Sequence, residues 1–114
     1  MDNLFDSDNY PDIEPDELKA GERWAWTRSE ITAAYPTSLY TLKYRFAPLN
    51  ATGTPIEITA AKTGSKHTVE EGQADTEHTP GDYYWQAVIV RDSDSEEVVI
   101  GDGYWVIVSN LDSA

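Results

Sequence analysis

The sequence predicts an all-β fold, a sandwich or small barrel of about six or seven short strands. Three observations support this prediction. Apolar and polar residues alternate along several short runs, with the two-residue period of a half-buried strand. Proline, glycine or asparagine stands at the breaks between these runs, in segments such as "NATGTP" and "HTPGD". No convincing apolar stripe has helical spacing, and 114 residues suffice for one domain with one core.

Residues 1–19 are predicted to form an extended acidic arm outside the folded domain. Its seven carboxylates face one basic residue, Lys19, and Pro11 and Pro15 interrupt any helix. Apolar residues are nevertheless spaced along the arm: Leu4, Phe5, Tyr10, Ile13 and Leu18. Two interpretations stay open. The arm is a disordered solubility tail, or these five side chains contact a neighbouring subunit and the arm orders on binding.

Residues 20–110 are predicted to form the β domain, and residues 111–114 a short C-terminal tail. In "GERWAWTRS", Trp24 and Trp26 share one face of a strand. The segment "SLYTLKYRF" has one apolar face, made of Tyr40, Leu42, Tyr44 and Phe46. Its other face is polar, made of Thr41, Lys43 and Arg45, as expected for a sheet with one wet side. "TPIEITA" is a further strand with Ile56 and Ile58 inward, and "KHTVE" a short, weak one.

The segment 79–108 reads as a hairpin whose two arms flank the acidic turn "RDSDSEE". In its first arm Tyr83, Trp85, Ala87 and Ile89 point one way, and the opposite face is also largely apolar. This strand is therefore expected at the centre of a sheet, with Trp85 buried between two sheets. In the second arm, Gly101 and Gly103 predict a β-bulge at which one residue adopts positive φ.

These motifs resemble parts of immunoglobulin-like domains. "PGDYYWQA", with Gly81, Tyr83 and Trp85, is similar to the start of their sixth strand, where a tyrosine closes a corner. "GDGYWVIV" is similar to the start of their last strand. The disulfide cysteines of antibody domains are absent. The resemblance therefore implies an immunoglobulin-like antiparallel β-sandwich of about seven strands, but not membership of the antibody family.

A second resemblance covers about residues 20–108. The order "AGERWAWTRS…YP…LYTLKYRF" followed by "PGDYYWQAVIVR…VIGDGYWVIV" resembles small proteins encoded in the head-morphogenesis and packaging gene cluster of tailed bacteriophages. It implies a virion structural protein, present in symmetric copies at the portal and neck or on the capsid surface. Its partners would be the portal, neck or major capsid proteins. The motifs are framework residues, so they transfer no catalytic role.

The composition of the chain argues against several further classes of function. The net charge of −13 argues against direct binding to nucleic acid or anionic membranes. The chain has no cysteine, so thiolate metal sites and thiol nucleophiles are excluded. No apolar run approaches the ~20 residues of a membrane span. The N-terminal stretch lacks the features of a secretory signal, and we expect a protein made in the host cytoplasm.

Candidate reactive groups are sparse, and we expect neither an enzyme nor a cofactor or metal protein. "DSDSEE", Asp92 to Glu97, alternates carboxylates, but Glu97 and Gly103 occupy the positions where a calcium loop needs Gly and Glu. A solvated turn explains it better than a weak cation site. His67 and His78 have no sequence-local partner for a metal or a nucleophile.

The four tryptophans and seven tyrosines suggest an alternative function. Aromatic rings on β-sandwiches can stack on sugars, so the rival hypothesis is a carbohydrate-binding or host-adhesion module. A small sandwich rarely buries four indoles. We therefore expect at least one of Trp24, Trp26 and Trp105 to reach the surface or an interface, and all three are candidate partner-binding residues. Trp85, with Tyr40, Tyr44 and Phe46, is expected in the core.

Overall fold

The structure, a computed structural model, describes residues 3, 5, 9–15, 17–49, 55–63, 66–72, 75–76 and 78–109. This part of the chain contains eight strands. They are β1 (Glu17–Ala20), β2 (Trp24–Arg28), β3 (Tyr40–Pro48), β4 (Ile56–Thr59), β5 (Ala61–Thr63), β6 (Lys66–Glu71), β7 (Gly81–Arg91) and β8 (Glu97–Ser109). The all-β prediction is confirmed, with one strand more than the expected seven. Leu4 and the predicted tail at 111–114 lie outside the described residues.

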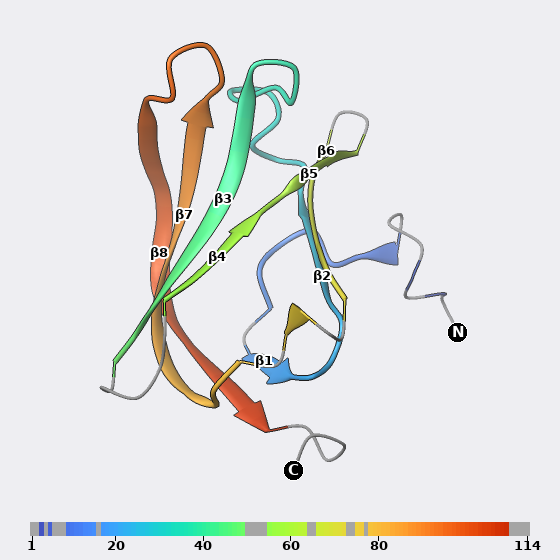
Figure 1. Ribbon diagram of the computed structural model, residues 1–114. Helices are drawn as coiled ribbons and strands as arrows, with labels where there is room; N and C mark the ends of the chain where they lie inside the picture. The colour runs from blue at the N-terminus through green and yellow to red at the C-terminus, as the bar shows by residue number, and fades with distance from the viewer. Residues whose placement is uncertain are drawn as a thin grey trace.

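The strands form two sheets (Figure 1). Sheet A has the order β1-β8-β7-β3-β4, and sheet B has the order β2-β6-β5. Within sheet A, β1 runs parallel to β8, whereas the other neighbours are antiparallel. The expectation of a purely antiparallel sandwich is therefore wrong for β1. Because β1 and β8 come from opposite ends of the chain, no hairpin dictates their direction.

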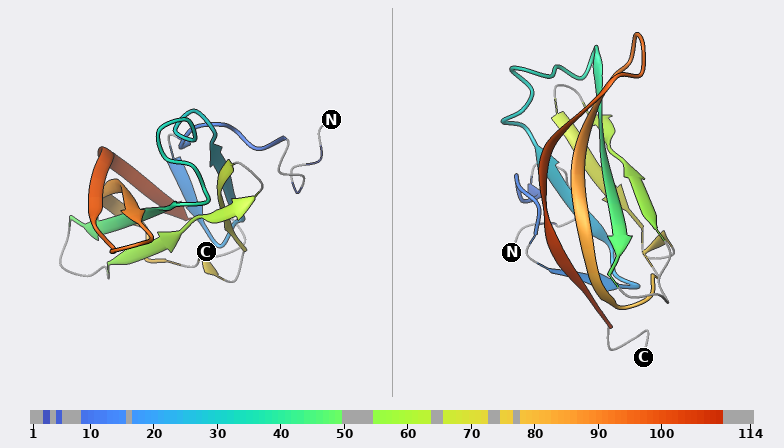
Figure 2. Two further views of the ribbon diagram at one scale, coloured as in Figure 1. Left: turned by 90° about the horizontal axis from the view of Figure 1, so that it is seen from above. Right: turned by 90° about the vertical axis from the view of Figure 1, so that its left-hand side faces the viewer.

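Sheet A curls rather than lying flat (Figure 2). One strand passes from sheet to sheet: β4 pairs with β3 in sheet A, and β5 pairs with β6 in sheet B. Between them, the Ala60 amide donates to the carbonyl of Leu42 at 2.8 Å. Strands that switch sheets make the corners of barrel-like sandwiches. The fold is thus a curled half-barrel of mixed strands closed by a smaller sheet.

Aromatic rings from both sheets meet around Trp105 of β8, which is 3% exposed. Its ring stacks on Trp85, with centroids 4.6 Å apart, and on Phe46, at 5.1 Å. Trp26 of sheet B meets it edge-on at 5.6 Å. The predicted inward face of β3 is confirmed for Leu42, Tyr44 and Phe46, which are buried, while Tyr40 is only partly buried.

Trp85 faces this core but is only partly buried, so the expectation of full burial is wrong. Its ring lies over Gly103, where an added Cβ would sit 2.9 Å from the indole Nε1. The predicted bulge is present next to Gly101, because Val88 pairs with Val99 while Ala87 pairs with Gly101. Neither Gly101 nor Gly103 has positive φ, which corrects that prediction. The glycine at 103 is required by the close approach of Trp85, not by its backbone conformation.

The described part of the predicted arm lies on the domain. The Thr27 amide donates to the Pro11 carbonyl at 2.8 Å, and the Trp105 indole donates to the Pro15 carbonyl at 2.5 Å. Leu18 is 3% exposed within the core. The boundary placed between residues 19 and 20 therefore falls inside β1. The acidic charge of residues 1–19 predicted a separate arm. The sequence alone does not show that Asp12 and Glu14 accept hydrogen bonds from Thr27 and Arg28 of β2.

Candidate binding face on sheet A

The outer face of sheet A carries a row of polar side chains across four strands. Arg45 of β3 pairs with Glu57 of β4 on one side and with Gln86 of β7 on the other. Gln86 in turn pairs with Asp102 of β8. The row therefore reads carboxylate, guanidinium, carboxamide, carboxylate. These are planar groups, each able to make two hydrogen bonds in one plane.

A second row beside it is small and aromatic. Ala47 of β3 pairs with Tyr84 of β7, which pairs with Tyr104 of β8. The two tyrosine rings are 5.4 Å apart between centroids, tilted by 55°. Tyr104 is 72% exposed, an unusual exposure for a large ring on a regular strand. Val106, the next outward residue of β8, is also exposed.

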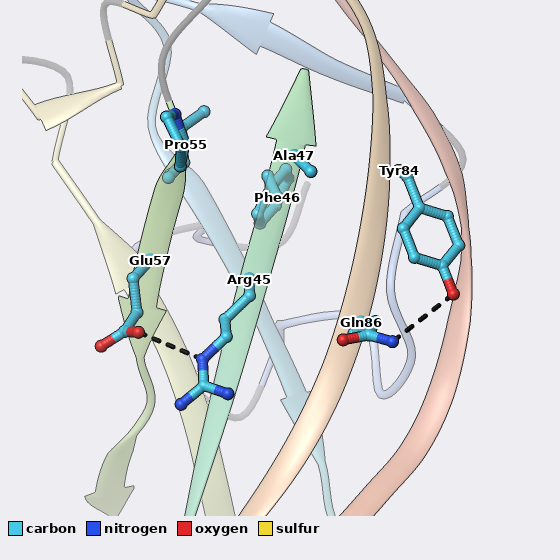
Figure 3. A pocket seen from close by; sticks show the side chains of 8 residues that line it. Arg45, Phe46, Ala47, Pro55, Glu57, Tyr84 and Gln86 are labelled. Carbon is cyan, nitrogen blue, oxygen red and sulfur yellow. Dashed lines mark hydrogen bonds and ion pairs between the residues drawn. The ribbon is translucent and has the colours of Figure 1, made fainter. Parts of the chain in front are cut away.

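A hollow of about 270 Å³ opens on this face at Ala47. Pro55 and Glu57 of the β4 side, Arg45 of β3, and Tyr84 and Gln86 of β7 line it. Figure 3 shows Arg45 and Glu57 turned toward one another on one side and Tyr84 and Gln86 on the other. The hollow exists because Ala47 is short while its neighbours across the sheet are long.

Ion pairs hold the polar row in place. Both terminal nitrogens of Arg45 donate to the Glu97 carboxylate, at 2.8 and 2.7 Å, and Arg45 Nε donates to Glu57 at 3.2 Å. Hydrogen bonds from Arg45 lower the pKa of Glu57 and of Glu97, so both stay ionised at neutral pH. The Arg45 charge is thus offset by two carboxylates, and the face as a whole is acidic.

Two hydrogen bonds of the Tyr84 hydroxyl join the tyrosine row to the polar row. The Tyr84 hydroxyl donates to Asp102 Oδ2 at 2.8 Å, and this bond raises the pKa of Tyr84. The phenol therefore remains a neutral donor at neutral pH. Gln86 Nε2 contacts the same hydroxyl at 3.5 Å. The arrangement can present apolar ring surface and hydrogen-bonding groups to one ligand at the same time.

The partner-binding residues predicted from sequence are placed elsewhere. Trp24, Trp26 and Trp105 are buried, with exposures of 3%, 0% and 3%. The expectation that at least one of these rings reaches the surface is therefore wrong. Tyr10 and Leu18 are also buried. Phe5 and Ile13 are 74% and 62% exposed, and their role as partner contacts stays a prediction. None of these residues lines the hollow on sheet A.

The remaining candidates have structural partners. Asp92 accepts from Lys62 at 2.6 Å and from Thr41, and Asp94 binds Arg91, so the hairpin acids serve ion pairs within the domain. His67 is buried with its Nε2 2.8 Å from the Tyr35 carbonyl oxygen, and His78 lies against Trp24. Among the described residues, no three metal-ligating side chains gather in one place. No helix there is long and apolar enough to cross a membrane.

Sequence reasoning missed Tyr84, Gln86, Asp102 and Tyr104. The alternation in "DYYWQ" and "GDGYW" contains the signal, because Tyr84 and Tyr104 each precede a core-facing tryptophan and so must face outward. Tyr84 lies opposite Tyr104, and Gln86 opposite Asp102, only because of the register of β7 against β8. This register cannot be predicted from the residue pattern of either strand alone. Comparison with protein-family models and with curated proteins finds no match for this chain.

Proposed function

We propose that the chain is a non-enzymatic structural protein of a tailed-bacteriophage virion, made in the host cytoplasm and held in the particle in symmetric copies. The resemblance of residues 20–108 to proteins of the head-morphogenesis cluster motivates the proposal. The observation that carries it is the outer face of β8, where Tyr104 and Val106 are 72% and 45% exposed. This face would contact a portal, neck or major capsid protein.

We further propose that the half-barrel is a variant of the immunoglobulin-like sandwich. Two features support this assignment. Strands β3, β7 and β8 are neighbours in one sheet and β2, β6 and β5 in the other, the division expected for strands C, F, G and B, E, D. The Tyr83 hydroxyl donates to the Thr79 carbonyl at 2.6 Å, as the tyrosine of the corner motif does with upstream backbone.

The charge of the chain indicates the surface that such a partner would offer. Each arginine forms an ion pair with a carboxylate of the domain. Acidic side chains outnumber basic ones by 21 to 8. The chain therefore has little positive charge left for contacts, and a basic partner surface would bind it with electrostatic steering.

Purified particles of the phage that encodes the chain test this proposal. Mass spectrometry should detect the protein, at about a dozen copies for a neck position or hundreds for the capsid surface, as ring and shell symmetry require. Val106→Lys should reduce incorporation, because it would place a positive charge against a basic partner surface. Leu39→Lys, at an exposed position beside the β7–β8 turn and at the opposite end of this hairpin from Val106, should incorporate normally. Absence of the wild-type protein from particles would reject the structural role.

A second candidate function, a carbohydrate-binding or host-adhesion module, is favoured by a different observation. The exposed ring of Tyr104 and the half-buried ring of Tyr84 form a pair directly beside the polar row of Glu57, Arg45, Gln86 and Asp102. Retention of the purified protein on gels that contain neutral polysaccharide would support this function. Unretarded migration on all such gels would count against it.

A further inference from the structure

We infer that the hollow at Ala47 is a binding site for one ring of a neutral glycan, whose neighbouring ring extends over Tyr104. This inference rests on the second candidate function and gives it a site and a ligand class. The hollow measures about 270 Å³. Pockets for drug-sized ligands measure ~300–1,000 Å³, so this one suits a single sugar ring rather than a whole oligosaccharide.

The chemistry of the lining matches that of a sugar. A pyranose has apolar C–H faces and a rim of hydroxyls that both donate and accept hydrogen bonds. Pro55, Ala47 and Tyr84 supply apolar surface to the hollow, and Tyr104 continues that surface onto β8. Arg45 is a donor, Glu57 an acceptor, and Gln86 carries both an amide donor and a carbonyl acceptor. Hydroxyl pairs on adjacent carbons fit such planar groups because both present two hydrogen bonds in one plane.

The electrostatics of the face select a neutral ligand. Glu57 lines the hollow, and Glu97 and Asp102 are hydrogen-bonded to its lining residues Arg45 and Tyr84. The two cations there, Arg45 and Lys43, are already paired with Glu57 and Glu97. A uronic acid, a sialic acid or a phosphorylated sugar would meet more negative than positive charge there. The net charge of −13 opposes polyanions at longer range as well.

A peptide is the main competing occupant, and the geometry favours it less. Extended peptides usually bind by adding a strand to a free sheet edge. The hollow instead lies on the face of sheet A, over β3 and β7, which are paired on both sides, and its opening is flanked by side chains of the edge strand β4 rather than by that strand's backbone. The free part of the β8 edge also carries a bulge and the charged Asp102, two features that discourage strand addition.

Isothermal titration with maltohexaose, cellohexaose and chitohexaose, and with alginate as an anionic probe, tests the inference on the full chain. Wild-type protein should bind at least one neutral hexasaccharide and not alginate. Tyr104→Ala should weaken Kd at least tenfold, and so should Ala47→Leu, which fills the hollow. Leu39→Ala, at a residue 58% exposed that precedes β3 at the end opposite the hollow, should leave Kd unchanged. All three positions are exposed, and equal melting temperatures will verify that each variant is folded.

The outcomes separate the site from the function. If wild type binds a neutral hexasaccharide but Tyr104→Ala and Ala47→Leu bind it equally well, the site is wrong and the carbohydrate function stands. If wild type binds none of the three neutral probes, both are rejected. Binding to alginate alone would overturn the neutral-ligand assignment. If no sugar binds and Tyr104→Ala fails to enter particles, the face is a protein contact instead.

Discussion

At the scale of single residues, Gly103 illustrates how a missing side chain shapes this core. Trp85 of β7 pairs directly with Gly103 of β8, and its indole occupies the space that a side chain there would need. The same ring stacks on Trp105 at 4.6 Å, so it cannot easily move aside. Gly101 lies under the far edge of the same indole, where the nearest atoms to an added Cβ are 3.8 Å away.

Gly103→Ala should therefore destabilise the domain by about 1–3 kcal/mol, the usual effect of overpacking a core. Gly101→Ala is the matched control and should be neutral or stabilising by up to ~1 kcal/mol, because alanine reduces the entropy of the unfolded chain. Urea unfolding followed by tryptophan fluorescence measures both free energies of unfolding. Equal free energies for the two variants would show that Trp85 does not pack on Gly103.

Asp12 shows a second single-residue effect, one that depends on pH. Its carboxylate accepts hydrogen bonds from the hydroxyl and amide of Ser29 and from Thr27 Oγ1. The Ser29 hydrogen bonds lower the pKa of Asp12 in the folded state. A lowered folded pKa means that this stabilisation is present above the unfolded pKa of ~3.9 and is lost as pH falls through the folded value.

Asp12→Ala should destabilise the domain at pH 7 by about 1 kcal/mol, the ordinary net value of hydrogen bonds at an exposed site. The difference from wild type should shrink as pH falls below 4, because the wild-type carboxyl then becomes protonated. Thermal unfolding of both proteins between pH 7 and pH 2.5 measures this difference. A gap that stays constant over that range would contradict the assigned role of the charge.

At the scale of elements, residues 11–15 and β1 form a strap on the domain rather than a free arm. Residues 11–15 lie along β2 and β8, and residues 17–20 pair with the end of β8. A small ionic cluster secures the strap. Glu14 accepts a 2.5 Å hydrogen bond from the Tyr44 hydroxyl and forms an ion pair with Arg28. Tyr44 is buried, and Glu14 and Arg28 are half-buried. Burial, followed by the Glu14 contact, raises the pKa of Tyr44 far above its ordinary value.

Leu18→Ala should consequently cost about 2–5 kcal/mol, the effect of truncating a buried leucine. Ile13→Ala, in the same strap but at a side chain 62% exposed, is the matched control and should change stability by less than ~0.5 kcal/mol. Urea midpoints of the two variants measure the contrast. Similar small losses in both variants would restore the earlier expectation of an arm that is independent of the domain.

At the scale of the whole molecule, charge is the dominant feature. The four arginines, together with Lys43 and Lys62, are paired with carboxylates, yet the net charge remains −13. Exposed ion pairs contribute only ~0–1 kcal/mol each, whereas the surplus carboxylates repel one another throughout the fold. Screening by salt should therefore weaken the repulsion among the surplus carboxylates more than the attraction within the ion pairs.

The melting temperature at pH 7 should rise when NaCl is increased from 0.02 to 0.5 M, because the Debye length falls from roughly 20 Å to roughly 4 Å. The same titration near pH 4.5, close to the isoelectric point of about 4.2, is the control and should show a smaller rise. Differential scanning calorimetry measures both. A melting temperature that falls with salt at pH 7 would mean that the ion pairs outweigh the net repulsion.

The sequence by itself determined six of the eight strands and the faces of most of them, but neither β1 nor the short β5. Alternation in "YTLKYRF" and "IEI" reports a two-residue period, a local property that pairing does not alter. The inward tryptophans of β2 follow the same rule. Burial of Trp24, Trp26 and Trp105 together was not predictable, because the room for several indoles comes from glycines and a curl in sheet A.

The tertiary structure alone decided the pairing of β1 with β8 and the composition of the binding face. Glu57, Arg45, Gln86 and Asp102 are distant in sequence, and only strand order and register bring them into one row. A shift of one residue would turn the entire set to the opposite face. Register is set by core packing across both sheets, a cooperative property of the folded chain that no short stretch of sequence contains.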